Sequence, residues 1–358
     1  MFQGTYAMEF AEAHVVTSAG LPIIDAQALD ANEQFVASLR NQGFALIKNP
    51  SPSIDIRGLE RESGDFFNMT DAFKNEYHKD KSPIGLGYYP FGVERAEGAT
   101  EQNFMEYYHY ATGHRLPYMF SEKVEGYFAA MRIVKIMLTQ WIDQVHTKEG
   151  FLLPTRIQNG GINTEGKEVR GINSVEEMAE LDLDSNIVRI IHYPAVSEDI
   201  GKVVNVAHTD ISALSLLFAT QPGLQLLGKD GRWYDVGANP DVLVVNAGDM
   251  LMWGTDGDRP ENSVTGIKST IHRVIRANDQ PRFAFAAFFG VKPWLQIQET
   301  LTARQAFDKR INGNLAKAGE VESVAKDSGD IDAITDGVGT LTLGDNTAGE
   351  MDGVADIV

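Results

Sequence analysis

Residues 203–218 read VVNVAHTDISALSLLF, and this stretch decides the fold. Two largely apolar runs, Val203–His208 with its three valines and Ala213–Phe218, predict strands separated by a short polar break. On an extended backbone, residues two apart share a face, so the side chains of His208 and Asp210 point the same way. An imidazole and a carboxylate presented together suit a divalent metal ion.

Similar short runs continue on both sides of this stretch. After Asn186 they alternate with Gly, Pro, Asn and Asp and show no intervening helical pattern. This arrangement favours an antiparallel sandwich or barrel. The further predicted strands are Ile187–Tyr193, Leu224–Leu227, Val242–Val245, Ser269–Arg276 and Phe283–Phe289.

The first half of the chain has a different character. Apolar residues recur there at helical spacing, with one strand-like run, Ala45–Lys48, between the first two helices. A Gly- and Asn-rich stretch, Asn159–Asn173, predicts a loop. The predicted helices are Glu33–Gln42, Ile56–Phe67 and Glu122–His146, with a closing helix at Ala303–Ile311.

Composition excludes several functions. The 358 residues carry 31 Lys+Arg against 50 Asp+Glu, a net charge of −19, which disfavours binding to nucleic acid. The absence of cysteine excludes disulfides, thiolate metal sites and cysteine nucleophiles. No apolar run is long enough for a membrane span, and the first ten residues lack the features of a secretory leader. We therefore expect a cytoplasmic protein that does not bind membranes.

The acidity is concentrated at the C-terminus. Residues 319–358 contain ten acidic residues and one lysine, so nearly half of the net charge lies there. The segment is glycine-rich and has no aromatic residue with which to build a core. It predicts a flexible extension or, through Val338, Leu341 and Leu343, an arm that contacts another subunit. The protein is accordingly expected to be a monomer or a homo-oligomer assembled through this tail.

His272, within the predicted strand Ser269–Arg276, is a candidate for a third metal ligand. Two imidazoles and one carboxylate form the facial triad of non-haem Fe(II) oxygenases, which leaves open positions for a co-substrate and O2. Ten residues later comes Arg282, a strand arginine whose guanidinium suits a carboxylate. A triad with open metal positions and one inward arginine that can bind a carboxylate together suit a keto-acid co-substrate.

These residues stand in blocks that resemble the Fe(II)/2-oxoglutarate-dependent dioxygenases of the isopenicillin N synthase-like family. The resemblance covers roughly Leu21–Ile311. It implies a mainly β fold, a distorted double-stranded β-helix or jelly-roll with flanking helices. The blocks that carry it start at His208 (HTDISALSLLF), Gly223 (GLQLL), Asp230 (DGRWYDV), Val244 (VVNAGDML) and Lys268 (KSTIHRV).

The resemblance also implies roles for individual residues. His208, Asp210 and His272 would hold Fe(II), and Arg282 would bind the distal carboxylate of 2-oxoglutarate beside Tyr193. The sequence departs from the family at Ala284, where a serine usually supplies a hydroxyl to the co-substrate. Such a lost hydrogen bond to a charged group costs about 1.5–3 kcal/mol if nothing replaces it.

The expected organisation has three parts. Residues 1–179 form a helix-rich N-terminal region, residues 180–318 form the jelly-roll core with its closing helix, and residues 319–358 form the tail. Candidates for the wall of the substrate pocket are Phe104, His109 and Phe288, for which ordinary core packing is the simpler alternative. The loop Asp256–Gly266 is a candidate lid or a simple exposed insertion.

The predicted function is oxidation, most simply hydroxylation, of an unactivated C–H bond in a small soluble metabolite. It would consume Fe(II)-bound 2-oxoglutarate and O2 and release succinate and CO2. Desaturation, ring closure and epoxidation use the same ligands and stay open. Two alternatives also stay open: an iron oxidase that uses the triad without 2-oxoglutarate, and a non-catalytic jelly-roll that binds a small ligand.

Overall fold

The computed structural model describes residues 20–52, 54–83, 85–92, 103–162, 166–179, 186–196, 200–257 and 265–310. The predicted acidic tail therefore lies outside the described residues, as does the centre of the loop at 256–266.

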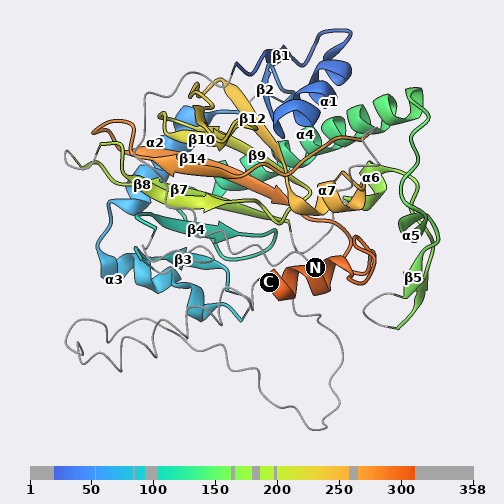
Figure 1. Ribbon diagram of the computed structural model, residues 1–358. Coiled ribbons are helices and arrows are strands. Elements are labelled where there is room, and N and C mark those ends of the chain that lie inside the picture. The colour runs from blue at the N-terminus through green and yellow to red at the C-terminus, as the bar shows by residue number, and fades with distance from the viewer. Residues whose placement is uncertain are drawn as a thin grey trace, which may run out of the picture.

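Two sheets face each other in a jelly-roll (Figure 1). The major sheet has eight strands in the order β1 (Ile23–Asp25), β2 (Phe44–Lys48), β12 (Val242–Ala247), β9 (Leu214–Ala219), β14 (Arg282–Phe289), β7 (Ile187–Tyr193), β4 (Glu106–Tyr110), β3 (Gly87–Tyr89). The minor sheet has the order β11 (Trp233–Asp235), β10 (Leu224–Leu227), β13 (His272–Ile275), β8 (Val203–His208). Within these two sheets only the β1–β2 pair is parallel.

The mainly β fold predicted from the sequence is confirmed. β7, β8 and β10 begin and end where the sequence pattern places them, and the other predicted strands differ at their ends. The N-terminal region is less purely helical than expected, since β1–β4 all join the major sheet. The stretch Asn159–Asn173 also contains a small hairpin, β5 (Gly161–Ile162) and β6 (Glu168–Val169), rather than only loop.

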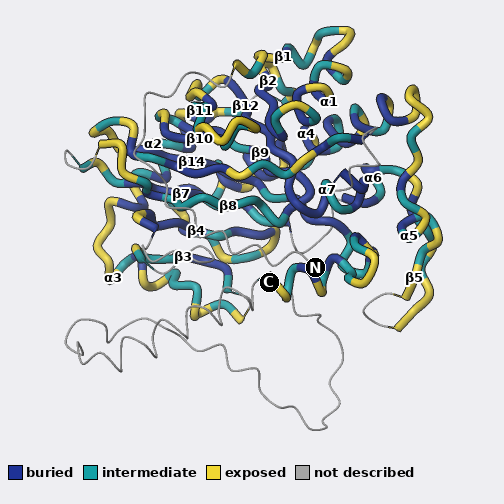
Figure 2. Tube along the Cα trace, in the orientation of Figure 1, coloured by how far each residue is buried: buried dark blue, intermediate teal, exposed yellow. Residues whose placement is uncertain are grey.

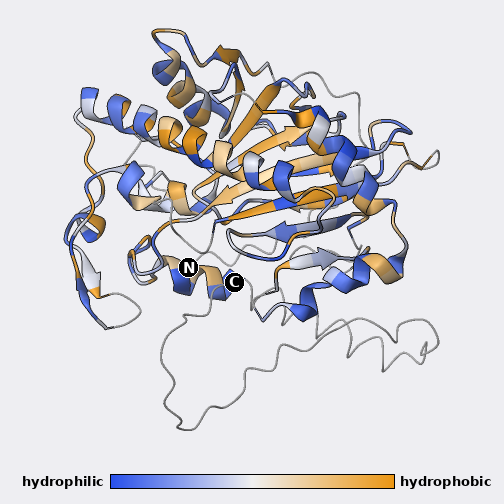
Figure 3. Ribbon diagram, turned by 180° about the vertical axis from the view of Figure 1, so that it is seen from behind, coloured by the Kyte–Doolittle hydropathy of each residue, from blue (hydrophilic) through white to orange (hydrophobic). Residues whose placement is uncertain are grey.

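The longest helix, α4 (Ser121–Lys148), lies across one face of the major sheet, as Figure 3 shows from behind. None of the helices in the described ranges combines the length and apolar character required to span a bilayer. The other helices are α1 (Ala31–Gln42), α2 (Ile56–Phe67), α3 (Asp71–Lys74), α5 (Thr155–Gln158), α6 (Val175–Met178), α7 (Asp249–Gly254) and residues 303–310, with single turns η1 (Asn75–Tyr77) and η2 (Lys79–Lys81).

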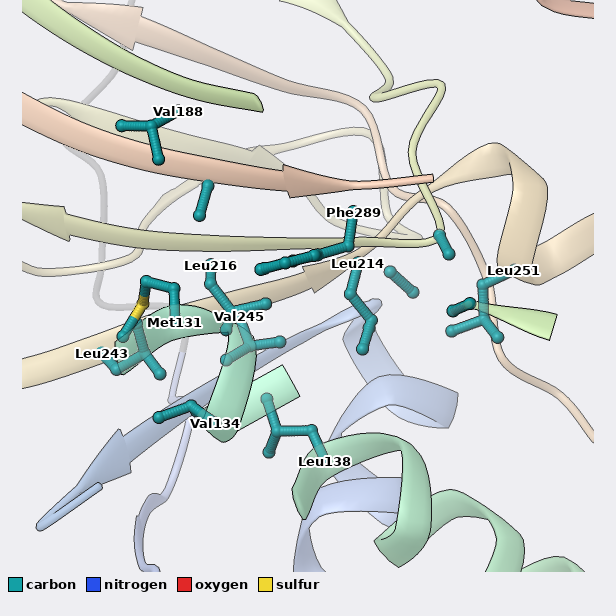
Figure 4. Close-up of a cluster of buried hydrophobic side chains, with 14 of the residues drawn as sticks. Met131, Val134, Leu138, Val188, Leu214, Leu216, Leu243, Val245, Leu251 and Phe289 are labelled. Carbon is teal, nitrogen blue, oxygen red and sulfur yellow. The ribbon is translucent and has the colours of Figure 1, made fainter. Parts of the chain in front are cut away.

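The main core fills the space between α4 and the major sheet (Figures 2 and 4). Met131, Val134 and Leu138 of α4 pack there against strand residues that include Leu216 and Phe289. Because side chains alternate along a strand, the neighbours of these residues face the interior between the two sheets.

β14 shows the alternation clearly. Phe283, Phe285 and Phe289 belong to the helix-side core, whereas Ala284 belongs to a second apolar cluster inside the barrel. That cluster also contains Phe44, Tyr193, Val204, Leu224 and Val274 from both sheets. Arg282, Ala284 and Phe288 therefore share the inward face of β14, as the sequence predicts.

Candidate metal centre

Three potential metal ligands meet at one end of the barrel interior. His208 ends β8 and His272 begins β13, and the two are directly paired in the antiparallel register. Asp210 follows β8 by two residues, and its Oδ1 lies 3.7 Å from Nε2 of His208 and 3.6 Å from Nε2 of His272. The ligand atoms of the three side chains lie within 4.8 Å of one another. The structure thus brings together the three residues that the sequence singles out.

Both imidazoles are oriented by the strands that carry them. Nδ1 of His208 lies 2.7 Å from the carbonyl oxygen of Val206, and Nδ1 of His272 lies 3.0 Å from that of Thr270. A carbonyl only accepts, so each Nδ1 must carry the proton and donate it. Nε2 is therefore the nitrogen of each ring that faces the carboxylate, and it can bind a metal ion once it is free of a proton.

The second oxygen of Asp210 is held by two donors. Oδ2 accepts hydrogen bonds from the Ser215 hydroxyl at 2.6 Å and from Nδ2 of Asn246 at 2.8 Å. Burial raises the pKa of Asp210, but the facing imidazoles and these two donors outweigh it and lower the pKa overall. The carboxylate is therefore ionised, with Oδ1 directed at the histidines.

A further network fixes the turn between the ligands. The backbone N–H of Asp249 donates to the carbonyl of Asp210 at 2.8 Å. Oδ2 of Asp249 accepts from the Thr209 hydroxyl at 3.1 Å and from Arg310 at 2.6 Å. Arg310, in the closing helix, also donates to Oγ1 of Thr209 at 2.8 Å. This network ties the closing helix to the turn that carries two of the three candidate ligands.

The wall beside His272 depends on a glycine. Gly43 ends α1 at φ 70°, and its N–H donates to the carbonyl of Leu39, a left-handed helix cap that favours glycine. A Cβ at this position would lie 2.5 Å from the Lys268 carbonyl, so the close approach also excludes a side chain. The turn places Phe44 edge-on against the His272 ring, with 5.5 Å between ring centroids.

Arg282 is buried at the start of β14, with 5% of its surface exposed. Its Nε donates to the carbonyl of Gln221 at 3.1 Å, and its guanidinium lies 5.0 Å from the ring centre of Tyr193. Burial lowers the pKa of Arg282, an effect that Tyr193 opposes. Its buried Nη1 has no hydrogen-bond partner among the described residues. Leaving such a donor unpaired costs about 1–3 kcal/mol or more for a charged group, which suits a site for an anion.

Ala284 lies two residues further along the same inward face. Its cross-strand neighbours are Ile191 and Ala219, which bring no hydroxyl in place of the missing serine. Tyr193 pairs directly with Arg282 in the β14–β7 register, so it is the hydroxyl-bearing residue next to that guanidinium.

The three candidate pocket residues do not lie together. His109 and Phe288 both contact Arg189: its Nε lies 2.6 Å from Nε2 of His109, and its guanidinium lies 5.7 Å from the Phe288 ring. Phe104 precedes β4 and contacts Phe91 and Arg276 instead. Sequence reasoning missed Arg189, although its alternation with the core residues Val188 and Ile190 would have placed it on the inward face.

His192 faces the opposite side of the sheet, as its alternation with Tyr193 predicts. Its Nδ1 lies 2.8 Å from Oε1 of Glu106, whose Oε2 accepts from Lys74 at 2.8 Å and from Tyr88 at 2.6 Å. All four residues are buried. We call Lys74, Tyr88, Glu106 and His192 the Glu106 cluster; both oxygens of its carboxylate are paired within the protein.

The residues at the metal centre fit a divalent ion. They supply two imidazole nitrogens and one carboxylate oxygen, the donor set of the 2-His-1-carboxylate iron sites. A jelly-roll that gathers this donor set and buries an arginine in its interior defines the class of non-haem iron oxygenases.

Comparison with known proteins identifies the family. The sequence model described as the 2OG-Fe(II) oxygenase superfamily matches residues 185–291. This match and the relatives described below support a non-haem Fe(II)/2-oxoglutarate-dependent dioxygenase of the isopenicillin N synthase-like superfamily, with Fe(II) as the metal and 2-oxoglutarate and O2 as co-substrates.

Individual relatives agree with this assignment. Gibberellin 2-beta-dioxygenase 2 of Arabidopsis thaliana is 25% identical over 283 residues, which cover 77% of this chain and 76% of the relative. A structure described as an oxygenase from Shewanella oneidensis has a TM-score of 0.64 at 27% identity, covering 82% of this chain and 97% of its own. A full-length Neurospora crassa protein, solved in complex with alpha-KG, shares the fold, with a TM-score of 0.57 at 22% identity over 76% of this chain and 86% of its own.

Proposed function

We propose that this dioxygenase hydroxylates an unactivated C–H bond of a small soluble metabolite and releases succinate and CO2. His208, Asp210 and His272 would hold the iron. When bound, Fe(II) supplies open coordination positions at which 2-oxoglutarate and O2 react. One observation carries the proposal: Nε2 of His208 and Nε2 of His272 both lie close to Oδ1 of Asp210, while Nδ1 of each ring is hydrogen-bonded to a backbone carbonyl.

The chain's own residues bind and orient the co-substrate. Arg282 would pair with the distal carboxylate of 2-oxoglutarate through the buried Nη1 that lacks a partner in the described structure. Tyr193 would lie beside it, and Ala284 would leave room where the family usually has a hydroxyl. The apolar side chains of the inner cluster, among them Leu224 and Val274, would keep water away from the reacting groups.

Substrate class follows from the setting of the site. The three candidate ligands lie together at the end of the barrel, and the chain is acidic, so a small molecule fits better than a nucleic acid. The relatives named above include a gibberellin dioxygenase, which also supports a small-molecule substrate.

The test is to measure succinate formed per substrate molecule consumed, using Fe(II)-loaded protein and a panel of small metabolites. Coupled formation of succinate and a hydroxylated product, with one atom from 18O2 in that product, is expected. Substrate oxidation without succinate would instead support an oxidase that leaves 2-oxoglutarate unused.

A further inference from the structure

The closing helix, residues 303–310, approaches the candidate metal centre through one side chain. Ala306 is buried in the main core, which anchors the helix. Arg310 follows Ala306 by four residues and therefore lies on the same face of the helix. One of its terminal nitrogens, Nη2, lies 2.6 Å from Oδ2 of Asp249 and 2.8 Å from Oγ1 of Thr209. The end of the helix thus contacts both the β12–α7 connection and the turn that follows β8.

The contact between Arg310 and Asp249 compensates a buried charge. The Asp249 side chain is 7% exposed, whereas that of Arg310 is 29% exposed. A carboxylate at such depth is costly unless an opposite charge and hydrogen-bond donors meet it. Arg310 supplies the charge, and the Thr209 hydroxyl donates to the same oxygen at 3.1 Å. The position of Asp249 therefore depends on whether the closing helix is docked.

Asp249 and Thr209 in turn lie against the candidate ligands. Thr209 stands between His208 and Asp210 in the chain. The backbone N–H of Asp249 donates to the carbonyl of Asp210 at 2.8 Å. Three residues before Asp249, Asn246 donates to Oδ2 of Asp210, also at 2.8 Å. The segment from Asn246 to Asp249 thus holds Asp210 by its main chain and by its side chain.

This segment is in direct backbone contact with the turn that follows Asp210. The N–H of Gly248 donates to the carbonyl of Ala213 at 3.0 Å. A Cβ on Gly248 would overlap the Ser212 carbonyl, so the close approach requires glycine. Because the two backbones touch, a displacement of Asp249 also displaces Asp210.

We propose that Arg310 is a positioning residue for the metal centre: when the closing helix is docked, Arg310 fixes the turn that carries His208 and Asp210 and thereby raises the affinity for a divalent ion. This inference rests on the proposed function, because it assigns the ion to these ligands. Arg310 is itself a cation, so its direct electrostatic effect on a metal ion is repulsive. Positioning and direct repulsion therefore predict opposite results. Without Arg310, the ion binds more weakly in the first case and more tightly in the second.

Coupling between two sites is reciprocal. If the docked helix raises the affinity for the ion by a given factor, the bound ion favours the docked helix by the same factor. Metal binding should therefore slow amide hydrogen exchange in residues 303–310 of the wild type, and R310M should lose this effect.

Mn(II) binding to the metal-free, full-length protein tests the proposal, measured by electron paramagnetic resonance without 2-oxoglutarate. We expect R310M to bind Mn(II) about 10-fold more weakly than the wild type, a loss typical of residues that orient metal ligands. R310K keeps a charged donor for Asp249 and should lie between the two. K309M is the matched control, because it removes the same charge from an exposed position one residue earlier and should bind Mn(II) as the wild type does.

A second variant separates positioning from a general loss of stability. R310M leaves the buried Asp249 without an opposite charge. The double variant D249N/R310M removes that charge and keeps the backbone N–H that donates to Asp210. It should regain a melting temperature close to that of the wild type and still bind Mn(II) about 10-fold more weakly. Recovery of Mn(II) affinity together with stability would overturn the positioning role.

The remaining outcomes distinguish the role of Arg310 from the proposed function. Unchanged or tighter Mn(II) binding in R310M would overturn the role of Arg310, as would an equal loss of affinity in K309M. A wild-type protein that fails to bind Mn(II), or an H208A variant that binds it as tightly as the wild type, would instead overturn the metal site of the proposed function.

Discussion

The two faces of the major sheet bury charge in different ways. On the helix side, the Glu106 cluster pairs both carboxylate oxygens with Lys74, Tyr88 and His192. On the barrel side, Arg282 buries an Nη1 with no partner in the described structure, and two Nε2 atoms face one carboxylate oxygen. His192 and Tyr193 are adjacent residues that serve the two faces. The difference teaches that a buried polar group whose partners are complete stabilises the fold, whereas one whose partners are incomplete marks a place for a ligand.

The largest expected effect comes from removing an imidazole on the barrel side. H208A should lose retained iron and succinate formation to below detection, because two ligands no longer form a facial triad. The melting temperature of the metal-free protein should change by only a few degrees. Metal analysis and succinate assays measure the first effect, and H114A is the control histidine outside the site. Retained turnover in H208A would refute the triad.

The helix-side cluster should respond through stability instead. E106Q removes the buried carboxylate partner of Lys74 and leaves it only the exposed Asp71, 3.4 Å away. Breaking a buried pair costs about 3–5 kcal/mol of unfolding free energy. The double variant E106Q/K74M should recover much of that loss. Denaturant unfolding gives the free energies. A large rise in the KM for 2-oxoglutarate without loss of stability would contradict the contrast between the two faces.

The same variant has a defined pH dependence. Burial raises the pKa of Glu106, but His192, Lys74 and Tyr88 lower it below its ordinary value of 4.5 overall. A carboxyl whose pKa is lower in the folded state stabilises the protein above the unfolded pKa, and this contribution disappears as the pH falls through the folded value. The stability difference between wild type and E106Q should therefore shrink below pH 4.5. If the stability difference between wild type and E106Q instead grows as the pH falls, the pKa of Glu106 is not lowered in the folded state.

A smaller effect is expected at Arg282. R282A removes a charge-assisted contact worth about 1.5–3 kcal/mol, so the apparent KM for 2-oxoglutarate should rise about 10- to 150-fold. Succinate formation at increasing 2-oxoglutarate concentration measures it. R282K should lie between the wild type and R282A. An unchanged KM would mean that this guanidinium does not bind the co-substrate.

The smallest change in the KM for 2-oxoglutarate is expected from substitutions at Ala284. A284S restores an inward hydroxyl two residues from Arg282, and a net hydrogen bond of about 0.5–1.5 kcal/mol would lower the KM for 2-oxoglutarate roughly 2- to 12-fold. A284V adds bulk without a hydroxyl and should raise the KM instead. A lower KM in both variants would show that packing, and not the hydroxyl, decides the effect.

The sequence predicts well which residues face the barrel interior. Val203–His208 and Phe283–Phe289 have an apolar period that the strands follow, so the inward direction of Arg282 and the meeting of His208 with Asp210 come from local pattern. The jelly-roll and the iron and 2-oxoglutarate chemistry came from the resemblance, and the comparisons confirm them.

The remaining residues depend on long-range pairing. Ser215 and Asn246 hold Asp210 only because β9 and β12 pair in a register that no local pattern specifies. Arg310 reaches Thr209 across 101 residues of sequence. The three-residue strands β1 and β3 exist because longer strands pair with them, so their sequences carry too little periodicity to reveal them. The division at residues 179 and 318 and the role of the acidic tail stay predictions.

The pairing of His208 with His272 has a mechanical consequence. β8 is the last strand in the order of the minor sheet, and β13 is its neighbour. An ion held by both histidines would link this outer strand to the rest of the barrel. If the ion binds only when the two strands are paired, the free energy that holds them together increases with the logarithm of the free iron concentration. Protease cleavage near β8 would then report iron occupancy: the same ion that supports turnover would protect the edge of the sheet from being opened.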